Sequence, residues 1–533
     1  MRTRNLLPIL ATIVVAALVS AAPAGAKGFK YGVTAGDVST SSALIWTRAD
    51  KAGRVTLQVS ADKHFGNHDD IARSLTAKKG HDNTLTAKVT HLRAGHVYIY
   101  RFTQGKNSSL VGRFVTPPKP SANKVIKFAF SGDADAQPAA GQKSPFYNKF
   151  EVYGRMAKEK NDFNVNLGDT IYSDSPVGAT IEGGAFHSHV PPALTVAQKW
   201  AKYRQNLALK NLQLVRGATG MYDHFDDHEF IDDFSRPTNG ETLYKAGVKA
   251  FIDYMPAKYT KKDGLYRSFR WGKNLEIFLP DEISFRSAKA GDSGVCDNKD
   301  TGEPDIAPNV PQNMRDTFSL LYPPLKNPVP QACLDKIADP TRTMLGSHQL
   351  ARFETAVKGS KAKWKVVLNE DPISQTYLFP LDQWEGYSAE RTSLLNFLKA
   401  NVKNAVFLTT DAHWTYFGDA RLKTLEPGGP VDSGVKELVT GPVAITTWGQ
   451  TINALTGRSD GANLVATAFY RQPPPNGPGL GCVSLLSYTY AEVKVTSKTL
   501  TLTPKDQAGN PVRETTKDGD TGPVCGPYTL TAK

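Results

Sequence analysis

Cysteine, internal repeats, low-complexity tracts and long hydrophobic runs are all scarce in this chain of 533 residues. After the N-terminal segment, no stretch approaches the ~20 apolar residues of a membrane-spanning helix, so we expect no membrane span once that segment is removed. Lysine and arginine do not gather in runs with interleaved aromatics, and we identify no nucleic-acid-binding motif. The net charge of +13 suits an anionic substrate or cell envelope. Lysines scattered over the surface are the simpler explanation of this positive charge.

The N-terminus has the pattern of a signal peptide. Arg2 and Arg4 precede an apolar run from Leu6 to Ala22, and Ala24-Gly25-Ala26 offers a small-residue cleavage site. We therefore expect residues 1–26 to be removed after Ala26 and the protein to be secreted or extracytoplasmic. A retained membrane anchor is the alternative, but Pro8 and the small residues at the end of the run disfavour it.

Only four cysteines occur: Cys296, Cys333, Cys482 and Cys525. A small even number in an exported protein predicts two disulfides, and four cysteines allow three connectivities. Nearness in the chain favours Cys296–Cys333 and Cys482–Cys525. A four-cysteine zinc site is rejected because no CxxC spacing is present.

Residues 28–117 are predicted to form a small all-β domain. Short alternating segments separated by turn residues favour strands over Ala43–Thr47, Arg54–Ser60, Thr84–Val89, Val97–Phe102 and Leu110–Val115. The stretch from Leu92 to Tyr98 is typical of a tyrosine corner, which locks a turn in immunoglobulin-like sandwiches. The proline-rich stretch 116–121 then marks a domain boundary.

From residue 124 the pattern changes to strands that alternate with helices, which predicts an α/β core with helices outside. The expected strands are Val125–Phe130, Phe163–Leu167, Leu275–Leu279, Trp364–Leu368 and Ala405–Thr409, and the expected helices are Tyr147–Lys158, Val196–Leu214 and Glu390–Ala400. This catalytic domain spans 124–485. Residues 280–340 are rich in glycine and proline, which indicates an insertion near the active-site mouth. Residues 486–533 are predicted to be a β extension with strands Ala491–Val495 and Thr499–Leu502 and a disulfide-clipped tail.

Five acidic motifs lie at or near the ends of predicted strands. They are Phe-Ser-Gly-Asp133, Leu-Gly-Asp169-Thr-Ile-Tyr172, Asp226-Asp-His-Glu229, Leu-Asn369-Glu and Thr-Thr-Asp411-Ala-His413. Parallel-rich sheets gather the carboxyl ends of their strands at one edge, where ligands bind. Hard oxygen and imidazole ligands drawn from such separated stretches differ from the local loops of zinc fingers and EF-hands. The pattern predicts a buried metal pair and metal-assisted hydrolysis, with a phosphate ester as the expected substrate.

Two of these motifs have a spacing that suits one metal cluster. The Asp169 carboxylate can bridge two cations, and Tyr172 can bind a ferric ion as phenolate, although an ordinary Gly-Asp turn has the same sequence. Asp411 and His413 follow a strand, and in an extended segment residues two apart point to the same side. His187 and His189 share that spacing but follow no strand, so we interpret them as a surface loop.

Other residues are candidates for binding and proton transfer. Asp227 would bind metal, and His228 would contact a phosphate oxygen or protonate the leaving group. An acidic surface loop is the alternative, which the flanking aromatic residues disfavour. Arg286 lies near Asp281 in the sequence. Two interpretations are equally justified: its guanidinium clamps phosphate oxygens, or it forms a structural salt bridge.

Together these residues resemble the PhoD-type alkaline phosphatase/phosphodiesterase family, within the calcineurin-like and purple-acid-phosphatase-like metallophosphatases. The segments that carry the resemblance are Phe29–Asp37, Leu44–Arg48, Asp226–Glu229, Arg342–Gln349 and Asp382–Arg391. It implies a four-layer αββα sandwich core after an immunoglobulin- or fibronectin-like domain. It also implies iron(III) and calcium as the ions, with zinc or manganese as alternatives. The implied metal ligands are Asp133, Asp169, Tyr172, Asp227, Asn369, Asp411 and His413.

Two departures from that family pattern concern the metal and the anion. Asp133, with Asp135 as a rival, stands where the best-known branch has a cysteine, and a carboxylate there could change the metal preference. Ile283 stands where that branch has an arginine, so one anion contact is expected to be missing.

The function predicted from these features is that of an exported, metal-dependent phosphoric ester hydrolase acting as a monomer. A metal-activated water would attack phosphorus in line, Arg286 would take up charge, and His228 would assist the departing oxygen. One alternative is nucleophilic catalysis through Ser131 or Thr170. Others are a non-catalytic envelope-binding or adhesion protein and a phospholipase D-like phosphodiesterase acting on phospholipids. The choice between phosphomonoester and phosphodiester stays open.

Overall fold

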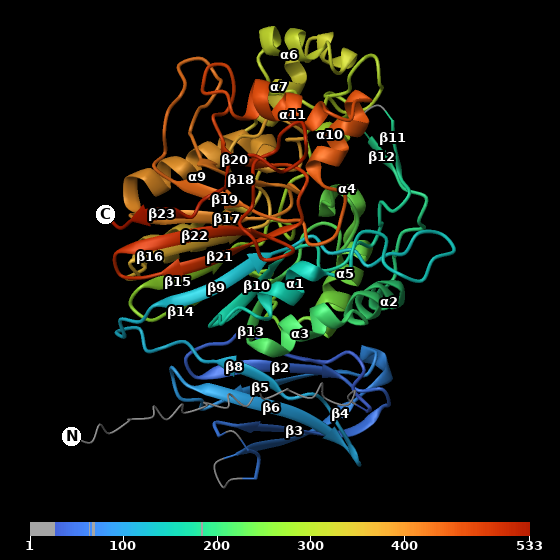
Figure 1. The fold of residues 1–533 in the computed structure, drawn as a ribbon, viewed down its shortest axis with the longest axis vertical. Coiled ribbons are helices and arrows are strands. Elements are labelled where there is room, and N and C mark those ends of the chain that lie inside the picture. The colour runs from blue at the N-terminus through green and yellow to red at the C-terminus, as the bar shows by residue number, and fades with distance from the viewer. Residues whose placement is uncertain (1–26, 63, 67–69, 183–184) are drawn as a thin grey trace, which may run out of the picture.

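Two β-sheets face each other in the centre of the molecule (Figure 1). The computed structural model describes residues 27–533 apart from 63, 67–69 and 183–184, so the expected signal peptide lies outside the described residues. The larger sheet runs β23 (Tyr528–Thr531), β22 (Thr499–Asp506), β21 (Thr489–Val495), β9 (Ile126–Ser131), β10 (Phe163–Leu167), β13 (Gly220–His224), β1 (Val33–Gly36), β2 (Ser42–Arg48) and β5 (Thr84–Thr90). The smaller runs β14 (Arg267–Trp271), β15 (Leu275–Leu279), β16 (Trp364–Asn369), β17 (Ala405–Thr409), β19 (Lys436–Val439), β18 (Thr415–Asp419) and β20 (Gly481–Ser484).

Helices cover the outer faces of both sheets and complete the four-layer αββα core that the resemblance implies. Apolar side chains from the two sheets pack between them, among them Val165, Ile277 and Leu408. The larger sheet packs outward on α1 (Glu151–Met156), α2 (Val196–Leu207), α3 (Lys210–Ala218) and α5 (Glu241–Tyr254). The smaller sheet packs outward on α8 (Ser347–Gly359) and α9 (Ser388–Asn401).

The remaining elements lie around this core. They are the short α4 (Arg236–Asn239), α6 (Gln312–Phe318), α7 (Gln331–Ile337), α10 (Trp448–Thr456), α11 (Gly461–Val465) and the hairpin β11 (Thr180–Glu182) with β12 (Ala185–His187). In Figure 1, α6, α7, α10 and α11 gather at the end of the molecule opposite the N-terminal strands.

The N-terminal residues form a β-sandwich, as the alternation of apolar residues predicts. A second sheet of β4 (Ile71–Ala77), β3 (Gly53–Ser60), β6 (Val97–Gln104), β7 (Asn107–Ser108) and β8 (Gly112–Val115) packs on β1, β2 and β5. The tyrosine corner is present, because the Arg93 amide donates to the Tyr98 hydroxyl at 2.8 Å. One parallel pairing, Gly36 with Met221, joins β1 to β13, so the sandwich continues the larger core sheet.

The strand predictions agree with the structure to within a residue or two, except that β22 continues four residues past the predicted end at Leu502. Two helix predictions need correction. The helix expected over 147–158 is limited to α1, and that expected over 196–214 is two helices. Leu209 between α2 and α3 has extended backbone angles (φ −77°, ψ 127°). The Gln213 side chain donates to the Leu207 carbonyl at 2.6 Å and satisfies the end of α2. The break lets α2 pack on α5 and α3 on α1.

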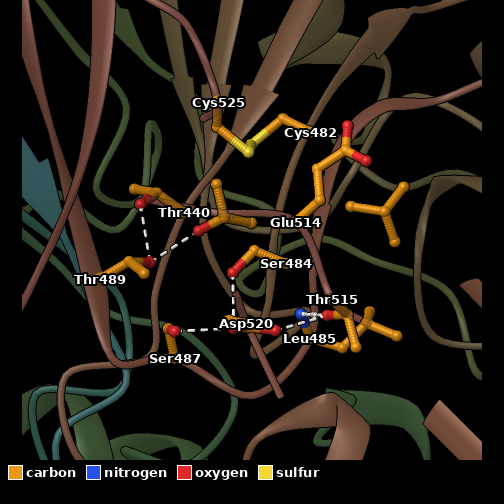
Figure 2. Close-up of a disulfide and its surroundings, with 12 residues drawn as sticks. Thr440, Cys482, Ser484, Leu485, Ser487, Thr489, Glu514, Thr515, Asp520 and Cys525 are labelled. Atoms are coloured by element: carbon orange, nitrogen blue, oxygen red, sulfur yellow. Dashed lines mark hydrogen bonds between the residues drawn. A yellow bond between two sulfur atoms is a disulfide. The ribbon is translucent and has the colours of Figure 1, made fainter. Parts of the chain in front are cut away.

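The C-terminal strands β21, β22 and β23 belong to the larger core sheet and extend it at one edge. β21 pairs with β9 in antiparallel register, from Ala491 opposite Phe130 to Val495 opposite Ile126. The tail that follows is fastened by the disulfide Cys482–Cys525 and by Asp520, whose carboxylate accepts hydrogen bonds from Ser484, Ser487 and Thr515 (Figure 2). The second disulfide joins Cys296 to Cys333, so both pairings expected from nearness in the chain are present.

Among the residues that the structure describes, no helix combines the length and the apolar character needed to cross a bilayer.

The tail disulfide should contribute measurably to stability. Replacing Cys482 and Cys525 together by serine opens a loop with a sequence separation of 43. We expect the free energy of unfolding to fall by about 2–4 kcal/mol because the unfolded chain regains loop entropy. Urea titration followed by tryptophan fluorescence measures this. Oxidised wild-type protein should expose no free thiol when denatured; two free thiols contradict at least one pairing, and four contradict both.

Candidate metal centre

The carboxyl ends of five strands bring the predicted ligands to one edge of the facing sheets. β9, β10 and β13 are parallel in the larger sheet, and β16 and β17 are parallel in the smaller one. Two contacts connect the sheets beside this edge. The Thr410 hydroxyl, after β17, donates to the Leu167 carbonyl of β10, and the Val443 amide donates to the Gly132 carbonyl at 2.9 Å.

Four candidate ligands lie where the backbone turns into the left-handed region: Asp133, Asp169, Asp411 and His413, with φ of 65°, 47°, 58° and 61°. Such angles are uncommon for residues other than glycine and cluster at functional sites. The prediction that Asp411 and His413 share a side of an extended segment is therefore wrong. They leave the strand through a tight bend, and a bend is what turns both side chains inward.

Gly168, just before Asp169, is required by close packing. Its φ is +82°, and a Cβ there would lie 2.8 Å from the Cβ of Asp226. No larger residue fits without moving the motif that carries Asp227, so the glycine sets the approach of these two segments.

The first cluster of ligand atoms comes from Asp133, Asp169 and His413, which all lie within 4.8 Å of one another. The Tyr172 hydroxyl contacts the His413 Nε2 at 3.0 Å. Burial lowers the pKa of His413 to about 3, so its imidazole stays neutral and can bind a cation. These four groups come from three different strand ends.

The second cluster shares Asp169 and adds Asp227 and His228. The His228 ring lies 4.2 Å from the Tyr172 ring, and its Nδ1 is 2.7 Å from the Asp174 carboxylate. Burial opposes protonation of His228, but the charges of Asp174, Asp227 and Asp169 outweigh it and hold its pKa well above the usual range. The imidazole is therefore a proton donor in this environment.

Buried carboxylates without partners make this a site for cations. Asp133 Oδ2, Asp169 Oδ2 and Asn369 Oδ1 are buried and accept no hydrogen bond. Burial, reinforced by the neighbouring acids, raises the pKa of Asp133, Asp169 and Asp411 well above the usual range. Uncompensated oxygens of this kind are costly unless a cation neutralises them. The donor set of carboxylate, amide and imidazole thus fits hard or borderline metal ions.

Asp133 is favoured over its rival Asp135 by their contacts. The Asp135 carboxylate accepts hydrogen bonds from the Gln137 amide at 2.9 Å and from the Ser175 hydroxyl. Asp133 receives only a long contact of 3.3 Å from the Asp411 amide, which leaves its other oxygen unpaired.

Arg286 and Asp281 lie away from the lining of the main cavity. Arg286 is 2% exposed, and its guanidinium donates to the Phe234 carbonyl at 2.7 Å and lies 3.6 Å from Asp371. The Asp281 carboxylate accepts from the Leu265, Ile283 and Ser284 amides, so it stabilises the turn after β15.

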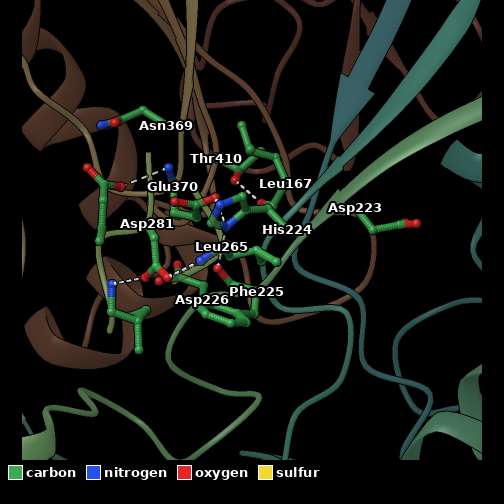
Figure 3. Close-up of polar contacts among 12 residues, drawn as sticks. Leu167, Asp223, His224, Phe225, Asp226, Leu265, Asp281, Asn369, Glu370 and Thr410 are labelled. Atoms are coloured by element: carbon green, nitrogen blue, oxygen red, sulfur yellow. Dashed lines mark hydrogen bonds and ion pairs between the residues drawn. The ribbon is translucent and has the colours of Figure 1, made fainter. Parts of the chain in front are cut away.

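A buried pair beneath the candidate ligands connects the two sheets (Figure 3). His224 at the end of β13 lies with its Nδ1 2.7 Å from the Glu370 carboxylate after β16, and both side chains are inaccessible to solvent. Asp227 follows His224 by three residues, and Asn369 immediately precedes Glu370. Neither His224 nor Glu370 was predicted, because no local spacing in the sequence signals a contact across the two sheets.

A cavity of about 460 Å³ opens above the metal centre. It is lined by Tyr172, His228, Asp411 and His413 from the predicted set. Sequence reasoning missed several polar residues of its wall: Asp174, Asp232, Asp233, Lys289, Asp382 and Gln383. Lys289 of this set, and Glu303, which also lines the cavity, come from segment 280–340, so this segment lies beside the cavity as predicted. His187 and His189 are exposed, as expected, although His187 ends β12 rather than lying in a loop.

Comparison with known proteins supports the same fold. A solved structure described as PhoD superposes over 96% of this chain and 90% of its own length, with a TM-score of 0.70 and 22% identity. The purple acid phosphatase PPD1 from yellow lupin (Lupinus luteus) seeds covers 94% of this chain, and this chain covers 74% of it, with a TM-score of 0.54 and 12% identity. Both share a two-sheet metallophosphatase fold with this chain.

The sequence identifies the family. Residues 136–501 match the family model of PhoD-like phosphatase, and residues 15–118 match its N-terminal domain. Alkaline phosphatase D of Bacillus subtilis (strain 168) is 27% identical over 424 residues, which are 72% of this chain and 64% of that protein. The match thus extends over somewhat less than two thirds of that relative. The chain belongs to the PhoD-like phosphatase family.

Stability of the metal-free protein should depend on pH in a specific direction. Burial raises the pKa of Glu229 to about 7 and raises the pKa of Asp133 and Asp169. The folded form therefore holds protons that the unfolded chain releases near pH 4, so stability is lost as the pH rises through these raised values. We expect the free energy of unfolding of chelator-treated protein to fall by about 1–3 kcal/mol between pH 5 and 8.

Urea titrations at both pH values, with and without added divalent cation, measure this effect. Added cation should remove most of the loss by neutralising the carboxylates. Asp518→Asn, which removes a largely exposed carboxylate, is the matched control and should keep the wild-type slope. A metal-free protein that becomes more stable as the pH rises contradicts the assignment.

Proposed function

We propose that this protein is an exported, metal-dependent phosphoric ester hydrolase. The observation that carries the proposal is the meeting of Asp133, Asp169 and His413 within 4.8 Å, beside the Asp227–His228 cluster, at the floor of an open cavity. Membership of the PhoD-like phosphatase family supports a phosphate ester as the substrate. Alkaline phosphatase and phosphodiesterase activities are both included.

The ligand atoms fall into two groups around Asp169. We assign Asp133, Tyr172 and His413 to one ion and Asp227, Asn369 and Asp411 to the other, with Asp169 between them. Iron(III) and calcium are the proposed ions, with zinc or manganese as alternatives. When bound, such ions supply Lewis acidity that activates water and takes up negative charge. Because Asp133 replaces a soft thiolate with a hard carboxylate, the ion beside it is the one whose identity is most open to change.

Residues of the chain would orient the ester and provide the proton. His228 is positioned by Asp174 and carries its proton, so it can donate to the departing oxygen. Arg286 is proposed to contact the phosphate oxygens through its Nη2, which has no hydrogen-bond partner. Because Arg286 lies outside the cavity lining, this contact requires its guanidinium to turn toward the cavity. The carboxylates of the cavity wall, with Lys289 paired to Asp233, would hold water and the alcohol portion of the ester.

The alternative functions have less support. The Ser131 hydroxyl donates to the Thr489 carbonyl at 2.8 Å, and that of Thr170 donates to Glu229. Both side chains are buried and neither lines the cavity above the metal centre, so neither is positioned to attack a bound ester. A purely envelope-binding or adhesion role gives no reason for unpaired carboxylates beneath a cavity. A phospholipase D-like activity on phospholipids is a special case of the proposed chemistry. The signal-like N-terminus and two disulfides support export, and a monomer is proposed.

Asp169→Asn should abolish the activity because it removes the charge shared by both clusters. We expect kcat for 4-nitrophenyl phosphate and bis(4-nitrophenyl) phosphate to fall by more than about a hundredfold, since even residues that only support ligands are worth 10- to 100-fold. Bound metal, measured by elemental analysis, should fall with it.

Asp135→Asn is the matched control for this variant. Asp135 is equally buried but engaged by Gln137 and Ser175, so its variant should retain stoichiometric metal. Near-native turnover in Asp169→Asn, or metal loss in Asp135→Asn alone, would contradict the proposed ligand assignment.

A further inference from the structure

An apolar pocket adjoins the cavity above the metal centre. Ile306, Leu378, Phe379 and Trp448 line both spaces, so they form the wall between them. Trp448 lies next to the candidate ligand His413, because the Trp448 amide donates to the His413 carbonyl at 3.0 Å. The pocket is therefore about one residue layer from the first cluster of ligand atoms.

The lining of this pocket is apolar although it contains one charged residue. Arg315 turns its guanidinium away and binds Asp305 at 2.8 and 2.7 Å and the Ala307 carbonyl at 2.6 Å. Its charge and its Nη1 and Nη2 donors are thus engaged by these partners. What remains toward the pocket is the apolar surface of α6, α10 and the segment around Phe469, with Phe318, Leu321, Leu325 and Ile452 among the lining residues.

Ring packing and hydrogen bonds fix the residues that line the pocket. The Phe379 and Trp448 rings meet edge to face, with centroids 5.4 Å apart, and the Trp448 Nε1 donates to the Tyr470 hydroxyl at 2.8 Å. The Phe379 amide donates to the Ile306 carbonyl at 2.7 Å, so the shared wall is held by main-chain and side-chain bonds. Phe318, Leu321 and Leu455 are only partly buried, and Leu320, next to them in the chain, is 87% exposed.

We propose that this pocket binds an apolar segment of the substrate, so that the enzyme prefers phosphate esters that carry an alkyl or aryl group near the phosphate. The inference rests on the proposed function and names its substrate class. In this proposal, the phosphate lies over the metal centre and the apolar group lies across the lining residues that the two spaces share. Apolar surface that leaves water on binding gains free energy in proportion to its area, and a preformed apolar pocket beside polar groups is typical of ligand sites.

The size of the pocket limits the length of that segment. Its space of about 60 Å³ for the centres of water-sized groups holds about four such groups at roughly 15 Å³ each. A group of about four to six carbon atoms, or one aromatic ring, would therefore fill it. Longer chains would extend beyond the pocket and gain little.

The test uses the metal-loaded protein and a series of alkyl 4-nitrophenyl phosphate diesters with methyl, butyl, hexyl and decyl groups, kept below micelle-forming concentrations. The leaving group is constant, so kcat/KM reports the alkyl chain. We expect kcat/KM to rise about fourfold per methylene and to level off between butyl and hexyl. A flat series overturns the proposal, and so does a rise that continues unchanged to decyl.

Two phenylalanine variants distinguish binding of the alkyl group in the pocket from a general effect of substrate hydrophobicity on activity. Phe318→Ser, in the pocket lining, should lower the ratio of butyl to methyl ester activity by about fivefold or more. Phe146→Ser removes an equally large residue that is 53% exposed and lines neither space, and it should keep the wild-type ratio. If Phe318→Ser unfolds, Leu455→Trp narrows the pocket from its rim and should move the plateau to shorter chains. Equal ratios in all variants overturn the proposal.

Calorimetry with methylphosphonate and hexylphosphonate tests the pocket apart from turnover. Hexylphosphonate should bind at least about tenfold more tightly to the metal-loaded protein. If no diester is hydrolysed but this difference is present, the proposed function fails and the pocket stands. Equal affinities, or no binding of either compound, overturn the pocket even if the diesters are hydrolysed.

Discussion

The burial of negative charge at one edge of two facing sheets is the constraint on which the rest of the structure depends. Asp133, Asp169, Asp227 and Asp411 lie at this edge, where burial and neighbouring acids raise the cost of ionising each of them. Such a group is stable as charged carboxylates only when cations are present. The surrounding structure must hold the oxygens apart at the spacing that ions require, even before an ion binds.

Backbone conformation and contacts between the sheets supply that rigidity. Left-handed angles at Asp133, Asp169, Asp411 and His413 cost of order 1–3 kcal/mol each and persist only where neighbours fix them. The dry layer of apolar side chains between the sheets sets their separation. At its edge, the Thr410 contact to Leu167 and the His224–Glu370 pair fix one sheet relative to the other. The strain at the ligands is thus held by the packing behind them.

The alternation of strands and helices predicted the sheets well, because buried parallel strands are nearly continuous apolar runs. The same reasoning found the ligands at their ends, since Asp133, Asp169 and Asn369 directly follow such runs. It failed at Asp411 and His413, where the chain bends instead of continuing, and at the break between α2 and α3. It also missed β13, because Asp223 and His224 at its end interrupt the apolar pattern, and it therefore missed His224. Contacts between sheets depend on register and layer spacing, which no local pattern contains.

Two parts of the chain contribute residues to the cavity: the strand ends and segment 280–340. The strand ends hold the acidic residues and cannot vary without disturbing both sheets. Segment 280–340 contributes Lys289, Glu303 and Ile306 to the cavity walls and is clipped by Cys296–Cys333. Its bidentate Arg315–Asp305 pair keeps the guanidinium out of the apolar pocket. Because this segment packs beside the sheets instead of between them, its side chains can change with little effect on the metal centre. Substrate preference can therefore differ among proteins that keep the same ligands, and the apolar wall around Phe379 and Trp448 is where such differences would arise.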